Sequence, residues 1–301
     1  MRNRFSRVMI AVGTAAVVAS LWLLATSTAG RAQAAGQVPS PGQFPTYRAP
    51  RLQGTQNPDL NGIWQSMTSA NWDIQDHETQ PGLHPELEGT YDAQPGGQGI
   101  VEGNEIPYQP WALAKKKENL AKRAVVDVLN DEKRYDTGDP ELTCYMPGVP
   151  RATYMPFPFQ IVQGTSPYIL IAYEYASTIR TIRMNFKEEA PTDSWMGWSR
   201  GRWEGDTLVV DVSGFNGYTW FDRAGNFHSD ALHVVERYTP VSAYHMMYEA
   251  TIEDPKVFTR PWKISLPLYR RMDKGVQLIE YKCVPYTEEL MFGKLRKVPR
   301  R

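Results

Sequence analysis

Apolar and polar residues alternate with a period of two along most of the chain after Phe157, a pattern typical of half-buried β-strands. Residues 244–253 show it most clearly, and we expect the even-numbered side chains from Tyr244 to Ile252 to face inward. Short polar connections such as Glu204-Gly205-Asp206 separate the apolar stretches. The chain is therefore predicted to be mainly β, an antiparallel meander that forms a barrel or a strongly curled sheet. The expected strands cover residues 59–65, 159–164, 168–175, 178–184, 195–203, 207–212, 232–238, 244–252, 256–266 and 276–283.

Helical spacing of apolar residues occurs over residues 110–134, which we predict to form one amphipathic helix with lysines mostly on its other faces. Between the first strand and this helix, residues 66–109 are irregular and contain the turn signals Pro81-Gly82 and Pro95-Gly96-Gly97. Such a stretch is long for a structureless loop, so we expect it to wrap the surface or to cover the mouth of a pocket. Residues 59–285 are thus predicted to be a single barrel-like domain, followed by a basic C-terminal tail over residues 286–301.

The start of the 301-residue chain has the features of a secretory signal. Arg2, Arg4 and Arg7 precede an apolar run, and Ala32-Gln33-Ala34 is a regular small-residue cleavage site. We predict a signal peptide over residues 1–34 and an extended leader over residues 35–58, with an uncleaved anchor as the alternative. The protein is then expected to be exported, to the periplasm or beyond, and to have no membrane contact once the signal is removed.

The charge balance argues against nucleic acid as a partner. The chain carries 33 basic and 33 acidic residues, and the predicted signal holds four arginines and no acid. Five further basic residues crowd the last eight positions, so the body of the protein is acidic. A surface of this sign repels the phosphate backbone.

The two cysteines, Cys144 and Cys283, both lie in the part of the chain expected outside the cytosol. Thiols are oxidised there, so one disulfide between them is predicted. There is no C-x-x-C spacing, which disfavours a zinc or redox role.

Two family resemblances follow from short motifs. Through residues 144–151 (CYMPGVPR), 201–210 (GRWEGDTLVV), 229–238 (SDALHVVERY) and 251–262 (TIEDPKVFTRPW), the chain resembles a large group of exported bacterial proteins of unassigned function. That resemblance covers residues 58–285 and implies export and a mainly β fold. Through Gly62-Ile63-Trp64 ahead of a meander, the chain also resembles lipocalin-like barrels. This second resemblance implies a barrel that holds a small apolar ligand.

Candidate chemistry concentrates between residues 195 and 238, where aromatic residues alternate with a few charged ones, as in small-molecule pockets. His228 lies in a polar loop and can exchange a proton near neutral pH, and Asp222 is placed to orient it. Glu236 and Arg180 share strand faces with apolar residues and are expected to point inward. In a catalytic arrangement Arg180 holds an oxygen of the ligand while His228 or Glu236 moves a proton. In the structural alternative, Arg180 and Glu236 are an internal ion pair.

A small lipophilic or aromatic molecule is the expected partner of this site. Its expected contacts are aromatic side chains, namely Trp195, Trp198, Trp220, Tyr173 and Tyr248. Gly197-Trp198-Ser199-Arg200-Gly201 matches the G-x-S-x-G elbow of hydrolases, but a strand follows where that motif needs a helix. The loose clusters His228, Asp230, His233 and His77, Glu78, His84, Glu86 lack metal-ligand spacing, and we expect neither a metal nor a cofactor.

Three functional classes remain open on this basis. The first, which we favour because of the loop that carries Asp222 and His228, is a cofactor-free enzyme that transfers protons on a small lipophilic or aromatic compound, in an isomerisation, elimination or hydrolysis. The second is a carrier that only binds such a compound. The third is an interaction module of the cell envelope that has no pocket.

Overall fold

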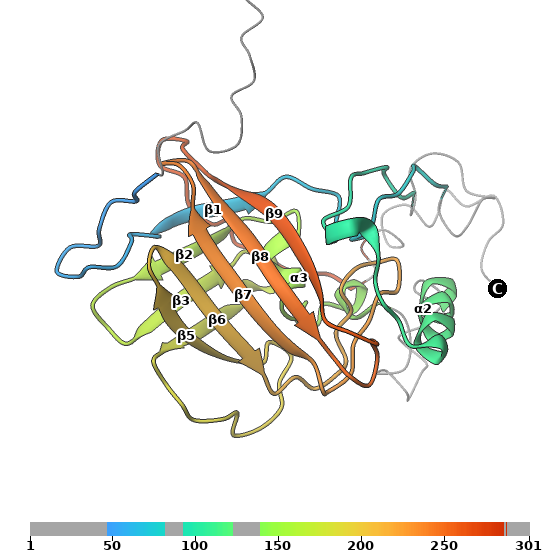
Figure 1. Ribbon diagram of the computed structural model, residues 1–301. Helices are drawn as coiled ribbons and strands as arrows, with labels where there is room; N and C mark the ends of the chain where they lie inside the picture. Colours follow the sequence, from blue (N-terminus) through green and yellow to red (C-terminus); the bar gives the residue numbers. More distant parts are fainter. Residues whose placement is uncertain (1–46, 82–92, 123–138, 286, 288–301) are drawn as a thin grey trace, which may run out of the picture. The chain divides into compact units, whose positions relative to one another are not determined.

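Nine strands close into a barrel in the computed structural model of the protein, in which β1 and β9 lie side by side (Figure 1). The structure describes residues 47–81, 93–122, 139–285 and 287. The predicted mainly β, barrel-like fold is confirmed. The strands are β1 (Gly62–Ser66), β2 (Phe159–Gln163), β3 (Tyr168–Tyr173), β4 (Ile179–Met184), β5 (Trp198–Glu204), β6 (Thr207–Ser213), β7 (His233–Pro240), β8 (His245–Glu253) and β9 (Trp262–Arg270).

One neighbouring pair of strands is parallel, which departs from the predicted all-antiparallel meander. β4 runs parallel to β5, with Ile182 opposite Ser199 and Met184 opposite Gly201. A closed ring with an odd number of strands cannot alternate direction at every step, so one parallel pair is required. Parallel neighbours cannot be joined by a tight hairpin, and residues 185–197 provide the longer connection.

The alternation of side chains in β7 and β8 matches the sequence prediction. Glu236, Tyr238, Met246, Tyr248, Ala250 and Ile252 are fully buried, and the residues between them are partly exposed. Tyr244 was expected inward and this is wrong, because it precedes β8 and is 54% exposed.

Two strand predictions fail near the C-terminus. The strand predicted at residues 256–266 begins only at Trp262, because the amides of Val257 and Phe258 bond to the Asp254 carbonyl in a turn. The strand predicted at 276–283 is irregular, and there the amide of Ile279 bonds to the Glu174 carboxylate. Apolar alternation alone does not make a strand where no neighbouring strand edge is free.

Some expected elements lie outside the described residues. They are the signal peptide (1–34), residues 35–46 of the leader, residues 123–134 of the helix and nearly all of the tail. The described part of the helix is α2 (Pro110–Lys122), and the remaining short helices are η2 (Glu102–Asn104), η3 (Pro140–Thr143), α3 (Arg151–Tyr154) and η4 (Tyr175–Ser177).

A cap formed by η3 and α3 covers the barrel end at which β1 finishes and β2 begins. The Tyr154 hydroxyl donates to the Phe221 carbonyl at 2.7 Å, and the Ser66 hydroxyl lies 3.4 Å from the Met155 carbonyl. The Arg151 guanidinium is 1% exposed and binds both oxygens of Asp139 at 2.7 Å. Buried charges are tolerated only when paired in this way, so the cap has one well-defined arrangement.

Glu141 links this buried pair to a second arginine. It accepts two bonds from Arg223, at 2.7 and 2.9 Å, and one from Arg151 at 3.1 Å. Burial opposes ionisation of Glu141, but the charges of Arg223 and Arg151 outweigh it and lower its pKa to about 2.

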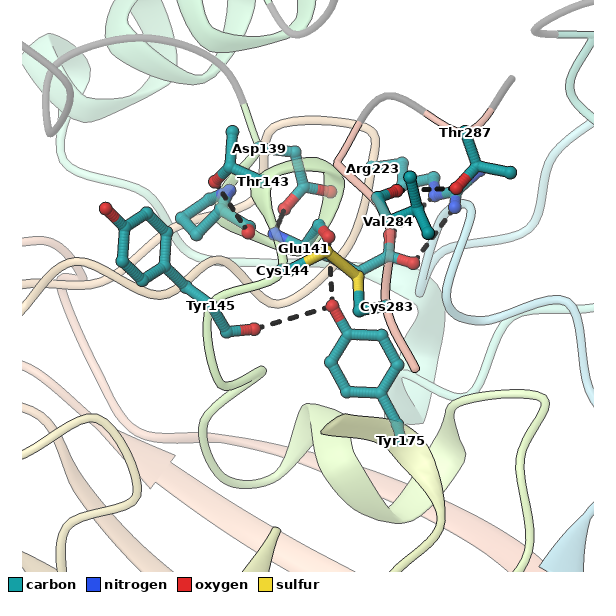
Figure 2. The surroundings of a disulfide bond; sticks show 11 residues. Asp139, Glu141, Thr143, Cys144, Tyr145, Tyr175, Arg223, Cys283, Val284 and Thr287 are labelled. Atoms are coloured by element: carbon teal, nitrogen blue, oxygen red, sulfur yellow. Dashed lines mark hydrogen bonds and ion pairs between the residues drawn. A yellow bond between two sulfur atoms is a disulfide. The ribbon is translucent and has the colours of Figure 1, made fainter. Parts of the chain in front are cut away.

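The predicted disulfide between Cys144 and Cys283 is present and fastens the C-terminal segment to the cap (Figure 2). Its Cα atoms are 5.6 Å apart. Figure 2 shows the Tyr175 hydroxyl directed at the carbonyls of Glu141 and Tyr145, at 2.9 and 3.4 Å. The segment around Cys144 is therefore held in two ways, by the hydrogen bonds from Tyr175 in η4 and by the disulfide.

The opposite barrel end is closed by the residues of the Gly62-Ile63-Trp64 motif. The Arg270 guanidinium lies 4.4 Å above the Trp64 ring, and the Trp64 indole donates to the Leu60 carbonyl at 3.0 Å. Gly62 has a φ of 142°, and a Cβ there would lie 2.5 Å from Arg270 Nη1. The glycine thus leaves room for the arginine, and the tryptophan is the surface on which it stacks.

We expect Gly62→Ala to lower the free energy of unfolding by about 1–3 kcal/mol, because alanine is strained at this φ and its methyl group meets Arg270. Urea denaturation measures the change. Gly164→Ala is the matched control, since a Cβ there meets nothing within 4 Å, and its effect should stay within about 0.5 kcal/mol. Equal losses in the two variants would contradict this role of Gly62.

Candidate functional site

The barrel interior contains a cluster of polar side chains, here called the interior polar cluster. It brings together four of the residues singled out in the sequence, Tyr173, Arg180, Glu236 and Tyr248, with Ser199 and Tyr238. Each member is at most 3% exposed. The cluster joins β3, β4 and β5 on one side to β7 and β8 on the other.

The Arg180 guanidinium binds both carboxylate oxygens of Glu236. Nη1 of Arg180 lies 3.1 Å from Oε1 of Glu236, Nη2 binds Oε2, and Nε donates to the Ser199 hydroxyl at 2.8 Å. Burial opposes the charge of Arg180, but Glu236, Tyr173 and Tyr238 together outweigh it and raise the pKa of Arg180 well above its usual range. The pair is therefore a permanent buried ion pair.

Two tyrosines complete the coordination of Glu236. The hydroxyls of Tyr238 and Tyr248 donate to its Oε1 at 3.0 and 2.9 Å. Burial, followed by the negative charge of Glu236, raises the pKa of both phenols well above normal, so they remain protonated donors. Glu236 accepts four hydrogen bonds, three at Oε1 and one at Oε2, all of them from groups of the fold, so this arrangement is that of a structural ion pair.

The Tyr173 hydroxyl is the unsatisfied member of the cluster. It is buried near Arg180 and near Thr153 on α3, but has no hydrogen-bond partner of normal geometry among the described residues. Burial raises the pKa of this phenol. An unpaired buried hydroxyl costs about 1–3 kcal/mol, which the surrounding network has to offset.

His228 lies behind the cap rather than in the barrel interior. Its Nδ1 donates to the Ser229 carbonyl at 2.8 Å, so Nε2 accepts from the Thr219 hydroxyl at 2.6 Å in the neutral ring. The rings of Phe215 and Phe221 lie 5.7 and 5.3 Å away. Burial lowers the pKa of His228 and keeps it neutral. Both ring nitrogens are occupied by the protein itself.

Asp222 was expected to orient His228, and this is wrong. Its carboxylate accepts bonds from the Ile74 amide at 2.9 Å and from the backbone and side chain of Asn226 at 3.1 and 2.5 Å. Asn226 in turn accepts from the Tyr108 hydroxyl at 2.8 Å. Burial, and then the negative charge of Asp73, raise the pKa of Asp222 to about 7, although the bonds from Asn226 and Ile74 oppose the shift.

The three tryptophans expected to line a pocket do not meet. Trp195 stacks on Tyr145 with ring centres 4.7 Å apart, beside the disulfide. Trp198 projects from the outer face of β5, where the Arg183 guanidinium covers its ring at 3.5 Å. Trp220 is bridged to Phe227 in the loop before β7. Tyr173 and Tyr248 alone among the predicted ligand contacts point into the barrel.

Neither the elbow motif nor the cluster of His228, Asp230 and His233 forms a site. Ser199 lies within β5 and accepts from Arg180. His233 is bonded to Asp211 at 3.0 Å, and Asp230 is paired with Lys256 at 2.6 Å on the surface. Residues 47–81, 93–122 and 139–285 contain no group of acidic, histidine or cysteine side chains arranged to hold a metal ion. His84 and Glu86 lie outside the described residues.

The structure has a large cleft that the sequence did not single out. β1 pairs with β9 as far as Ser66, which lies opposite Leu268. Toward the start of β9, its neighbour is instead the segment 100–101, which bonds to Ser265 and Ile264. The cleft, of about 810 Å³, opens between these two contacts. Its described lining carries no formal charge and is rich in hydroxyls and amides, from Gln65, Ser66, Thr68, Ser69, Gln98, Ser265 and Tyr269.

The far wall of the cleft is held in place by backbone bonds. Gly97 exchanges two bonds with His77, at 2.9 and 3.1 Å, and the Gly99 amide donates to Asp76 at 2.6 Å. A Cβ on Gly97 would lie 1.6 Å from the Ser69 hydroxyl, so glycine is required for this close approach. The cleft is thus built into the fold.

Sequence reasoning missed the cleft because its residues are chemically ordinary. The available signal was the long irregular stretch over residues 66–109, which was expected to wrap the surface or cover a pocket mouth. Two parts of that stretch, residues 66–69 and 96–100, line the cleft.

Comparison with protein-family models, with curated proteins and with solved structures finds no match for this chain. In the part of the chain that the structure describes, every helix is too short or too polar to cross a membrane.

Breaking the interior ion pair should be costly. We expect Arg180→Met to lower the free energy of unfolding by about 3–5 kcal/mol, because it leaves Glu236 buried and uncompensated. Adding Glu236→Gln should cost less than the sum of the single variants in urea denaturation. Arg200→Met is the control: its 2.6 Å pair with Asp211 is partly exposed, and its loss should cost at most about 1 kcal/mol. Strict additivity at Arg180 and Glu236 would contradict the coupling.

The raised pKa of Asp222 predicts a pH-dependent effect. A carboxyl whose pKa is about 7 when folded and 3.8 when unfolded stabilises the fold most below pH 3.8, and loses this contribution as pH rises through 7. Relative to Asp222→Asn, the wild-type protein should therefore lose stability between about pH 4 and 7. Thermal unfolding across this range measures the difference. Asp230→Asn, at an exposed aspartate, should show no such trend, and a flat difference for Asp222→Asn would refute the assignment.

Proposed function

We propose that the protein is an exported binding protein that holds a small, uncharged, hydroxyl-rich molecule of the saccharide class in the cleft between β1, β9 and residues 96–100. The observation that carries the proposal is the cleft itself, about 810 Å³ in volume, whose described lining combines hydroxyl and amide groups with apolar side chains such as Met67 and Leu266 and carries no formal charge. Volumes of about 300–1,000 Å³ are usual for small-molecule sites.

The chemistry of the lining supports an uncharged polar ligand. Gln65 already accepts from Arg271 at 3.1 Å through its carbonyl, which leaves its amide N–H groups to donate. Ser69, Gln98 and Ser265 add donors and acceptors. An ion entering this cleft would lose water without meeting an opposite charge, which disfavours it, whereas hydroxyl groups can exchange water for these side chains.

Tyr269 supplies a ring against which a sugar can lie. It is 36% exposed in the cleft and is held edge-on by His245, with ring centres 5.1 Å apart at 78°. Rigid aromatic rings give contact area at a low cost in conformational entropy.

Binding is better supported than turnover. The described lining of the cleft holds no acidic, basic or histidine side chain that could carry a proton-transfer step. The residues expected to carry proton transfer, His228 and Glu236, use their hydrogen-bonding capacity within the fold. Export is supported by the disulfide, which persists in oxidising compartments. The ligand expected from the sequence, a lipophilic or aromatic compound, suits this lining less well.

The test is calorimetric titration of the mature protein with the uncharged disaccharides cellobiose, maltose and N,N′-diacetylchitobiose. At least one should bind, and Tyr269→Ala should weaken it about tenfold through the lost ring contact. Gln98→Ala should also weaken binding.

Tyr168→Ala is the matched control, because Tyr168 is similarly exposed (42%) but lies on β3 away from the cleft, and it should leave the affinity unchanged. If none of the three disaccharides binds at millimolar concentration, or if Tyr168→Ala is as harmful as Tyr269→Ala, the proposal is rejected.

A further inference from the structure

A second, smaller cavity of about 270 Å³ opens at the barrel end that Trp64 closes. Tyr47, Tyr244, Leu60 and Met272 contribute its aromatic and apolar walls. Arg270 is the cation in its described lining. A small apolar chamber with one basic side chain is a common way to bind an organic anion.

Arg270 has hydrogen-bonding capacity that the fold does not use. Its Nη1 donates to the Asn61 carbonyl at 2.5 Å, its Nε is buried and closed to a ligand, and its Nη2 forms no hydrogen bond with the described residues. It forms no ion pair with a carboxylate of the described residues. Its stacking on Trp64 fixes the plane of the guanidinium, so the remaining donors are held in one orientation.

Among the described residues, the two fully buried arginines differ from the half-buried Arg270 in this respect. Arg151 and Arg180 each bind a carboxylate, and the partner raises the pKa of each. Burial instead lowers the pKa of Arg270, against the weaker influence of Asp59 and Tyr47. The charge of Arg270 is thus only partly compensated, and an anion in the cavity would complete the compensation.

Asp59 also lines the cavity but is engaged elsewhere. Its Oδ1 accepts from the backbone and side-chain amides of Asn61, at 3.0 and 2.8 Å. These bonds hold the Asp59 carboxylate in the turn before β1, where it forms no direct ion pair with Arg270.

We propose that this cavity binds a small organic carboxylate with an aromatic or branched aliphatic body, its carboxylate on Arg270 and its body between Tyr47 and Tyr244. The site is separate from the cleft and does not depend on the function proposed there. The carboxylate would accept charge-assisted bonds from the guanidinium, and the apolar walls exclude strongly hydrated ions.

The test is calorimetric titration of the mature protein with benzoate and with benzamide, its uncharged isostere. Benzoate should bind at least about tenfold more tightly than benzamide, because charge assistance favours the anion. Arg270→Gln should weaken benzoate binding about tenfold, and Tyr244→Ala should weaken it several-fold by removing a wall. Tyr244 is exposed and outside the strands, so this variant keeps the site testable if Arg270→Gln fails to fold.

Arg271→Gln is the matched control, because this neighbouring arginine pairs with Asp273 on the surface and does not line the cavity. It should leave benzoate affinity unchanged, as should Tyr269→Ala in the cleft. Equal affinity for benzoate and benzamide, equal losses in Arg270→Gln and Arg271→Gln, or no benzoate binding at millimolar concentration would each overturn the proposal.

Discussion

The ion pair between Arg180 and Glu236 is the interaction on which the barrel most depends. Each charge is stable in the interior only while the other is within bonding distance, and the two come from strands that are not neighbours, β4 and β7. Tyr248 on β8 and Ser199 on β5 complete their hydrogen bonds. A slip of one residue in any of these strands would turn its member of the cluster outward. The pair therefore fixes strand register as much as it contributes stability.

Much of the fold could be predicted from the sequence, because alternation and turns are local signals. The inward face of β7 and β8 follows from period-two patterning, and the Cys144–Cys283 bond follows from there being two cysteines in a chain whose first residues predict export. The direction of β5, which runs parallel to β4, is not set by a local signal. It is decided by closure of a ring with an odd number of strands, which is a property of the whole barrel, although the long connection over residues 185–197 already excluded a tight hairpin.

The candidate site was less predictable for a related reason. The sequence correctly predicted that four polar residues point into the barrel, namely Arg180, Glu236, Tyr173 and Tyr248. Whether a buried acid acts as a base or as an ion-pair partner, however, depends on its neighbours in space. His228 and Asp222 are close in sequence and polar, yet each finds different partners, Thr219 and Ser229 for one and Asn226 and Ile74 for the other. The cleft is made of serines, glutamines and glycines, which carry no chemical signature until the fold brings them around one space.

The disulfide has a topological consequence for the barrel. Cys144 and Cys283 are 139 residues apart, and the covalent loop that they close contains every strand from β2 to β9. β1 is the one strand outside this loop. It can therefore separate from β2 and β9 while the other strands stay within one covalently closed loop. Both cavities border β1 and β9. A molecule bound in either cavity would contact both strands, and it would therefore stabilise the pairing of β1, the one strand that the disulfide loop does not include.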